Sequence, residues 1–108
     1  MSSAKIDEIK KEVASNKIVI YMKGTKDAPR CGFSARAVGI LKDLDVPFKD
    51  VDVLADQEKW QAVKELSDWP TIPQVYVNGV FLGGGDQLAE MHAAGDLAPL
   101  VQKPMSQP

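Results

Sequence analysis

Hydrophobic residues recur along the N-terminal part of the chain in two patterns, one helical and one typical of strands. Apolar side chains three or four positions apart predict an amphipathic helix over residues 3–14, with Ile6, Ile9 and Val13 on its buried face. The β-branched and aromatic run that follows, residues 18–22, predicts a buried strand. The chain therefore begins with a helix and then a strand.

The middle of the chain predicts a loop, a helix, a strand and another helix. Residues 23–30 hold a glycine and a proline among polar residues, which predicts a loop. Helical spacing resumes near Cys31 and ends before Pro47, with Phe33, Ala37, Leu41 and Leu44 in register. Residues 48–53 then predict a strand, with Asp50 and Asp52 on a solvated face. Asp56 is placed to cap a helix over residues 57–67.

The last third of the chain contains the strongest turn signal. Asn78-Gly79 separates two short apolar runs, residues 75–77 and 80–82, which predicts a β-hairpin. Glycines 83–85 then open a helix that we expect Asp86 to cap and Gly95 to end. A last short helix follows near residues 96–102.

This order of elements predicts an α/β architecture. A strand–helix–strand unit implies a parallel pair, and the hairpin adds two antiparallel strands. The result is a four-stranded mixed sheet flanked by helices on both faces, which is the thioredoxin fold, although other small α/β folds fit the same pattern. We expect a single domain over residues 1–108, with a flexible tail after about residue 102.

Composition and charge exclude several classes of protein. Thirteen Lys and Arg against 15 Asp and Glu give a net charge of -2, and no basic run is present, which argues against nucleic acid as a main partner. No apolar run approaches the roughly 20 residues needed to cross a bilayer. Residues 1–13 lack the apolar core of a secretory signal and hold Asp7, Glu8 and Glu12, which a transit peptide would avoid, so we expect a cytoplasmic protein. A mitochondrial or plastid matrix protein whose transit peptide was removed is the alternative.

The chain has one cysteine, Cys31, at the point where the predicted loop becomes a helix. One cysteine excludes a disulfide within the chain and a zinc site built from several cysteines. Free N–H groups at a helix start favour a thiolate, which is both a nucleophile and a metal ligand. Lys23, Arg30 and Arg36 add positive charge nearby. A buried, inert thiol is the alternative, but Arg30 and Gly32 do not suit a core position.

Several ordered motifs resemble the monothiol glutaredoxins of the CGFS type. The signature is Cys31-Gly32-Phe33-Ser34, and further matches are the stretches 22–25 and 69–74, Asn78-Gly79, Gly83-Gly84 and Asp86. Ser34 stands where dithiol relatives have a second, resolving cysteine, and its hydroxyl is expected to be solvated. Gly85 stands where many family members have a cysteine.

The resemblance implies a glutathione site around Cys31. The backbone of Ile72, between Thr71 and Pro73, would pair with the cysteinyl part of glutathione as a short antiparallel strand. Pro73 would be in the cis form. Lys23 and Lys64 would meet the glycyl carboxylate. Gly84, Gly85 and Asp86 would hold the γ-glutamyl group. The same residues also suit plainer roles: solvated lysines, a rigid turn, and a glycine turn with a helix cap.

The sequence departs from the family at Trp60. Relatives usually have an arginine about nine residues before the Trp-Pro-Thr motif, where it binds the glycyl carboxylate, and this chain has Trp60 there. The departure predicts weaker glutathione binding, or use of another low-molecular-weight thiol. Trp60→Arg is then expected to tighten glutathione binding. A core-facing Trp60 is the plainer alternative.

The resemblance also implies an iron–sulfur function. A [2Fe–2S] cluster takes four thiolate-type ligands, and each chain supplies only Cys31, so two chains and two glutathiones would complete the set. We expect a cluster-bridged homodimer, monomeric without the cluster, that transfers it to apo iron–sulfur acceptor proteins. The alternatives are a glutathione-dependent thiol–disulfide oxidoreductase with Cys31 as nucleophile, and a sensor that shares a cluster with a partner in a heterodimer.

Overall fold

A four-stranded mixed sheet forms the centre of the structure, a computed structural model that describes residues 3–102. In the strand order β4-β1-β5-β6, β1 (Ile18–Met22) is parallel to β4 (Lys49–Asp52) and antiparallel to β5 (Gln74–Val77), which pairs antiparallel with β6 (Val80–Gly83). The predicted mixed sheet and thioredoxin-like fold are confirmed. The tail predicted after residue 102 lies outside the described residues.

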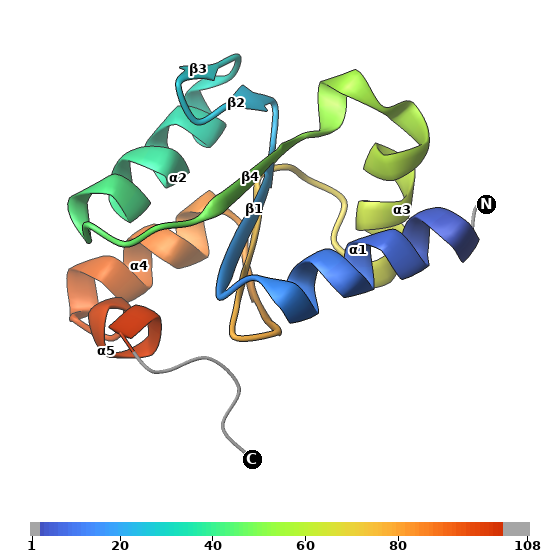
Figure 1. Cartoon of the computed structure of the whole chain (residues 1–108). Coiled ribbons are helices and arrows are strands. Elements are labelled where there is room, and N and C mark those ends of the chain that lie inside the picture. Colours follow the sequence, from blue (N-terminus) through green and yellow to red (C-terminus); the bar gives the residue numbers. More distant parts are fainter. Residues whose placement is uncertain (1–2, 103–108) are drawn as a thin grey trace.

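Helices cover both faces of the sheet (Figure 1). On one face α1 (Ser3–Ser15) packs against α3 (Gln57–Ser67). On the other face α2 (Gly32–Asp43) packs against α4 (Gly85–Ala94), and α5 (Leu97–Gln102) lies beside α4. None of the described helices is long and apolar enough to span a bilayer.

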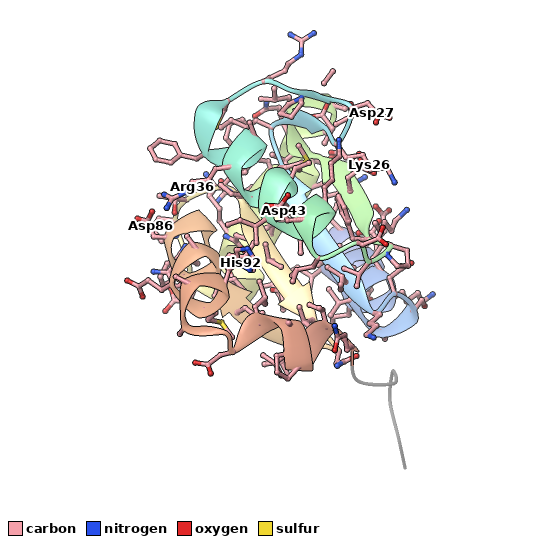
Figure 2. All side chains as sticks on the ribbon, turned by 90° about the vertical axis from the view of Figure 1, so that its left-hand side faces the viewer. Lys26, Asp27, Arg36, Asp43, Asp86 and His92 are labelled. Carbon is pink, nitrogen blue, oxygen red and sulfur yellow. The ribbon has the colours of Figure 1, made fainter. Side chains whose placement is uncertain are left out.

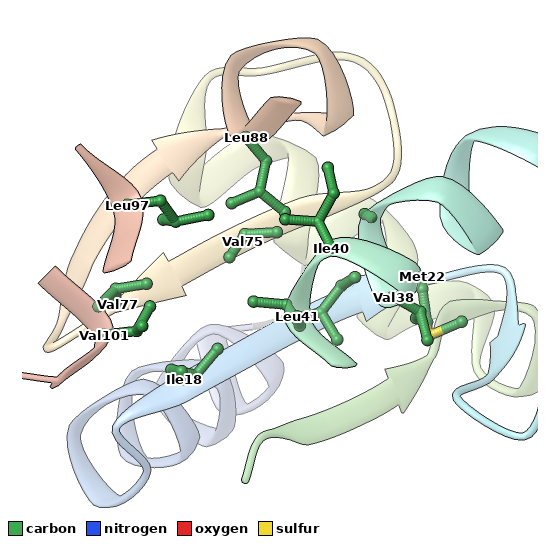
Figure 3. Packing of buried hydrophobic residues seen from close by; sticks show 12 residues of the cluster. Ile18, Met22, Val38, Ile40, Leu41, Val75, Val77, Leu88, Leu97 and Val101 are labelled. Carbon is green, nitrogen blue, oxygen red and sulfur yellow. The ribbon is translucent and has the colours of Figure 1, made fainter. Parts of the chain in front are cut away.

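The alternation of side chains along β1 supplies both cores. Ile18, Ile20 and Met22 point into the core under α2 and α4, which Figure 3 shows from close by. Val19 and Tyr21 point the other way, into the core under α1 and α3. All five side chains are at most 1% exposed. Because successive side chains of a strand point to opposite faces, a strand covered on both sides has to be apolar throughout, as this one is.

The segment predicted as a loop, residues 23–30, contains a small hairpin. Its two strands, β2 (Gly24–Thr25) and β3 (Ala28–Pro29), pair antiparallel. Gly24 has φ +89°, and a Cβ there would lie 2.5 Å from the carbonyl oxygen of Ala28. Only glycine fits such a close approach at a positive φ. Two-residue strands are too short to leave a periodic signal in the sequence.

Asp50 and Asp52 anchor this hairpin to the sheet, so the prediction of a solvated acidic face is wrong. The Asp50 carboxylate accepts a hydrogen bond from the N–H of Lys26 at 2.8 Å, and Asp52 accepts one from the N–H of Gly24 at 2.9 Å. Asp52 also accepts from an N–H of the short 3-10 helix η1 (Val53–Ala55). This cap ends β4 one residue earlier than predicted.

Candidate functional site

A groove of about 480 Å³ lies between the end of β1, α3, the segment before β5 and the start of α4. Its lining includes all eight residues predicted to bind glutathione: Lys23, Lys64, Thr71, Ile72, Pro73, Gly84, Gly85 and Asp86. It also includes residues to which the sequence analysis gave no role in binding: Phe33, Trp69, Pro70 and Gln87. With Phe33 at the start of α2, five segments of the chain thus form one surface.

Cys31 is the N-cap residue of α2, with extended backbone angles φ -154° and ψ 145°, and is partly exposed. Partial burial raises the pKa of its thiol, but hydrogen bonds from Ser34 and Phe33 and the charge of Lys23 outweigh this, so the pKa lies below its ordinary value. The backbone N–H groups of Phe33 and Ser34 are the free donors expected at a helix start, and the Ser34 hydroxyl adds a further hydrogen bond. The geometry therefore favours a thiolate at Cys31.

Ser34 is fully buried, so the prediction of a solvated hydroxyl is wrong. Its Oγ accepts a hydrogen bond from the backbone N–H of Lys23 at 3.1 Å. The same hydroxyl contributes to the low pKa of Cys31. Ser34 thus ties the end of β1 to the first turn of α2 and places Lys23 near the thiol. A serine in a first helical turn is usually solvated, so the sequence carried no signal of this contact.

The floor of the groove is the segment before β5. The Ile72–Pro73 peptide bond is cis, as the family resemblance implied. Gln74 has no exposed surface, and its side-chain amide donates hydrogen bonds to the carbonyl oxygens of Trp69 at 2.8 Å and Thr71 at 3.2 Å. Burial of a polar side chain requires such partners. Gln74 therefore fixes the shape of the turn, a role the sequence analysis missed.

One end of the groove is the N-terminus of α4. The helix begins one residue before Asp86, with Gly84 as its N-cap, so Asp86 is not the cap that was predicted. The N–H of Gly84 donates to Oε1 of Gln87 at 2.9 Å. Asp86 instead lies 3.5 Å from Arg36 of α2, and Figure 2 shows the two side chains facing each other. This exposed ion pair bridges α2 and α4.

The other end of the groove carries two ammonium groups on one indole ring. Nζ of Lys23 lies 5.4 Å and Nζ of Lys64 lies 5.5 Å from the ring centre of Trp60. Trp60 is half-buried, packs against the core under α1 and α3, and also lines the groove, so it is both a core and a groove residue. Its neighbour Lys59 points away from the groove and bonds to Glu8 at 2.6 Å.

Comparison with known proteins identifies the family. The family model described as Glutaredoxin matches residues 18–82. The chain is 50% identical over 101 residues to an uncharacterized monothiol glutaredoxin of Synechocystis, covering 94% of this chain and 92% of that protein. It is 48% identical to the chloroplastic monothiol glutaredoxin-S14 of Arabidopsis thaliana, covering 92% of this chain but 57% of that longer protein.

Solved structures agree with this. The solution structure of reduced poplar apo GrxS14 is 46% identical, with a TM-score of 0.79 and coverage of 89% of this chain and 88% of that chain. The holo form of poplar glutaredoxin C1 is 24% identical, with a TM-score of 0.82 and coverage of 92% and 87%, and so supports the fold alone. The thioredoxin-like fold, the single cysteine and these relatives together show that the chain belongs to the monothiol glutaredoxins.

Proposed function

We propose that two copies of this chain bind a [2Fe–2S] cluster between them, with one Cys31 from each copy and two glutathione molecules as ligands. The cluster is cargo that passes to apo iron–sulfur acceptor proteins. The observation that carries the proposal is the solitary thiol of Cys31, whose pKa is lowered by Ser34, Phe33 and Lys23, together with the groove that Phe33 and Lys23 line. Within residues 3–102, no group of three or more His, Cys, Asp and Glu side chains could hold a metal. A four-ligand cluster therefore needs ligands from outside the chain.

The charges at the two ends of the groove support glutathione as the second ligand. Lys23 and Lys64 at one end suit the glycyl carboxylate. The N–H groups at the start of α4 suit the γ-glutamyl carboxylate, and Asp86 suits its ammonium. Between them, the backbone of Ile72 would pair with the cysteinyl part as a short strand, with Thr71 and Pro73 beside it.

The surface around Cys31 suits contact with a second chain. Phe33, two residues away, is 66% exposed although it is a large apolar side chain. This aromatic ring offers a second chain apolar contact surface beside the thiol. We expect a monomer without the cluster and a homodimer with it, because the shared cluster supplies the main link. A heterodimer with another cluster-sharing protein would use the same surface.

Anaerobic reconstitution tests the proposal. The protein is incubated with iron, sulfide and glutathione, and its visible spectrum, iron and sulfide content and sedimentation are recorded. We expect a coloured dimer with one cluster per two chains, followed by transfer of the cluster to an apo ferredoxin. Cys31→Ser should give a colourless monomer. Wild-type protein that stays colourless and monomeric in glutathione would contradict the proposal.

The low pKa of Cys31 also supports a second function, glutathione-dependent thiol–disulfide exchange. The Cys31 thiolate would attack the glutathione sulfur of a protein mixed disulfide, releasing the protein thiolate and forming a Cys31–glutathione disulfide. A second glutathione thiolate would then release Cys31 and leave as oxidised glutathione. Turnover of a glutathionylated protein at the rate of a dithiol glutaredoxin would rank this function first.

We place this function in the reducing environment of the cytoplasm, because Cys31 has to stay reduced to act. Relatives named as chloroplastic and mitochondrial make an organelle matrix the alternative. A fluorescent fusion of the full-length gene product distinguishes the two.

A further inference from the structure

We infer that Lys23 and Lys64, held together on the ring of Trp60, make this chain tolerant of the position of the terminal carboxylate on the thiol ligand. The chain should therefore bind glutathione and its homologue with one more methylene group almost equally. The inference rests on the proposed function, because it concerns the thiol that binds in the same groove. It assigns to Trp60 the role of a positioning residue, which acts through the two lysines on its ring.

The end of the groove at Trp60 holds more positive charge than the protein itself neutralises. Lys23 arrives from the end of β1, and Lys64 lies one helical turn after Trp60 on the same face of α3. Neither ammonium group lies in an ion pair with any residue that the structure describes. Both line the groove, so the groove is where an anionic partner can reach them.

The indole ring holds these two charges in place. Each ammonium lies within 5.5 Å of the ring centre, close enough for a cation–π interaction. The ring itself is held because Trp60 packs against the core under α1 and α3. The backbone of Lys23 is held as well, by its hydrogen bond to Ser34. Two like charges from different elements therefore stay together without a carboxylate between them.

An ammonium group recognises an anion differently from a guanidinium. A guanidinium binds a carboxylate through two parallel hydrogen bonds, which fixes the position of the carboxylate. An ammonium acts as a point charge, and its attraction falls only as the inverse of distance. Moving a carboxylate from 4 Å to about 5.5 Å, roughly one C–C bond, lowers the Coulomb attraction by about a quarter. The same shift would break a bidentate pair completely.

This arrangement selects γ-glutamyl-cysteinyl thiols that end in a carboxylate, and it tolerates a difference of about one bond in the distance of that carboxylate from the cysteinyl residue. Glycine and β-alanine at the third position place the carboxylate about one bond apart, and two ammonium groups side by side can serve both. A terminal ester or amide has no charge and should bind poorly. Trp60 contributes apolar surface and position, and the lysines contribute the charge.

Intrinsic fluorescence provides a direct test, because both tryptophans of the chain, Trp60 and Trp69, line the groove. Reduced wild-type protein is titrated with glutathione, with γ-glutamyl-cysteinyl-β-alanine and with glutathione glycyl ethyl ester. We expect the dissociation constants of the first two to agree within about threefold. The ester should bind about tenfold more weakly than glutathione, because it lacks the charge.

Two variants separate the effect of positioning the two lysines from the effect of a bidentate guanidinium group. Trp60→Arg, read by the remaining Trp69 or by calorimetry, should bind glutathione more tightly and reject the β-alanyl thiol by about tenfold. Trp60→Leu keeps the apolar packing but removes the ring, so both thiols should weaken by a similar factor while their ratio stays near one. Thermal unfolding checks that each variant is folded.

The failures are distinguishable. If wild-type protein binds glutathione but binds the β-alanyl thiol more than tenfold more weakly, this inference is overturned and the proposed function stands. If wild-type protein binds neither thiol, the proposed function itself fails. The ratio of the two dissociation constants on wild-type protein tests the inference even if a variant does not fold.

Discussion

Helix α3 carries two lysines five residues apart, and the protein treats them in opposite ways. Lys59 is 7% exposed and bonds to Glu8 at 2.6 Å and to Glu12 at 2.5 Å, both on α1. Burial lowers the pKa of Lys59, but the two carboxylates outweigh it, so the pKa is raised. Lys64, on the groove side, has no carboxylate partner within residues 3–102 and rests on the ring of Trp60.

The difference separates a structural charge from a binding charge. Lys59 docks α1 on α3, and Glu12 extends the network by accepting a hydrogen bond from the Tyr21 hydroxyl at 2.8 Å. A buried charge that the protein neutralises, such as Lys59, contributes to stability and is out of reach of a ligand. The charge of Lys64 is positioned by Trp60 but is not neutralised by a carboxylate of the described residues, so it contributes little to stability and is available to bind an anionic ligand. One helix thus serves both the core and the groove.

Lys59→Met should produce the largest loss of stability. Removal of one partner of a buried pair leaves the other charges uncompensated, at a cost of about 3–5 kcal/mol. Because Glu8 still reaches solvent, we expect a decrease in the free energy of unfolding of about 2–3 kcal/mol. Urea unfolding measures it. Lys64→Met is the matched control and should change the same quantity by less than about 0.5 kcal/mol; equal losses would erase the distinction.

Lys64→Met should instead weaken glutathione binding by about tenfold, since it removes one of two charges that attract the terminal carboxylate. Calorimetry with reduced protein measures the dissociation constant. The effect should shrink as ionic strength rises, because salt screens a partly exposed pair. Unchanged affinity at low salt would show that Lys64 takes no part in binding.

Ser34→Ala should raise the pKa of the Cys31 thiol, because the hydroxyl is one of the groups that stabilise the thiolate. The rate of Cys31 alkylation by iodoacetamide, followed against pH, measures this pKa. The midpoint of the profile should move to higher pH in the variant. A midpoint that does not move would leave the helix N–H groups and Lys23 as the whole cause.

The pH dependence of stability should show the smallest effect. The Lys59 ammonium lowers the pKa of the Glu8 carboxyl in the folded protein. A lowered folded pKa gives a contribution that is present above the unfolded pKa and is lost as pH falls through the folded one. The stability gap between wild type and Lys59→Met should therefore stay constant near neutral pH and narrow in acid. A gap that widens in acid would contradict the assignment.

The repeating parts of the fold could be predicted from the sequence, and the single contacts could not. Periodicity and the Asn78-Gly79 turn located the helices and the main strands, because each rests on several residues in register. The contact of Ser34 with Lys23 depends on one hydrogen bond between two elements that the fold brings together. The caps at Asp52 and Gly84 each depend on one local hydrogen bond, which leaves no periodic pattern in the sequence.

The candidate site shows the same division. Six of the eight predicted groove residues stand in the family motifs, all except Lys64 and Gly85, and the resemblance also implied the cis form of Pro73. The placement of two lysines on Trp60 and the pairing of Asp86 with Arg36 followed no motif. Both arise where the sequence departs from the family pattern or where side chains of two helices meet.

The glutathione content of the cluster-bound dimer shows whether two chains and two thiols share one cluster. Reconstituted protein is separated from free thiol by anaerobic gel filtration, and iron, sulfide, protein and released glutathione are quantified in the same peak. We expect two glutathiones and one [2Fe–2S] cluster for every two chains, with the cluster lost when glutathione is removed. A cluster that persists on the dimer without glutathione, or one cluster on each single chain, would contradict it.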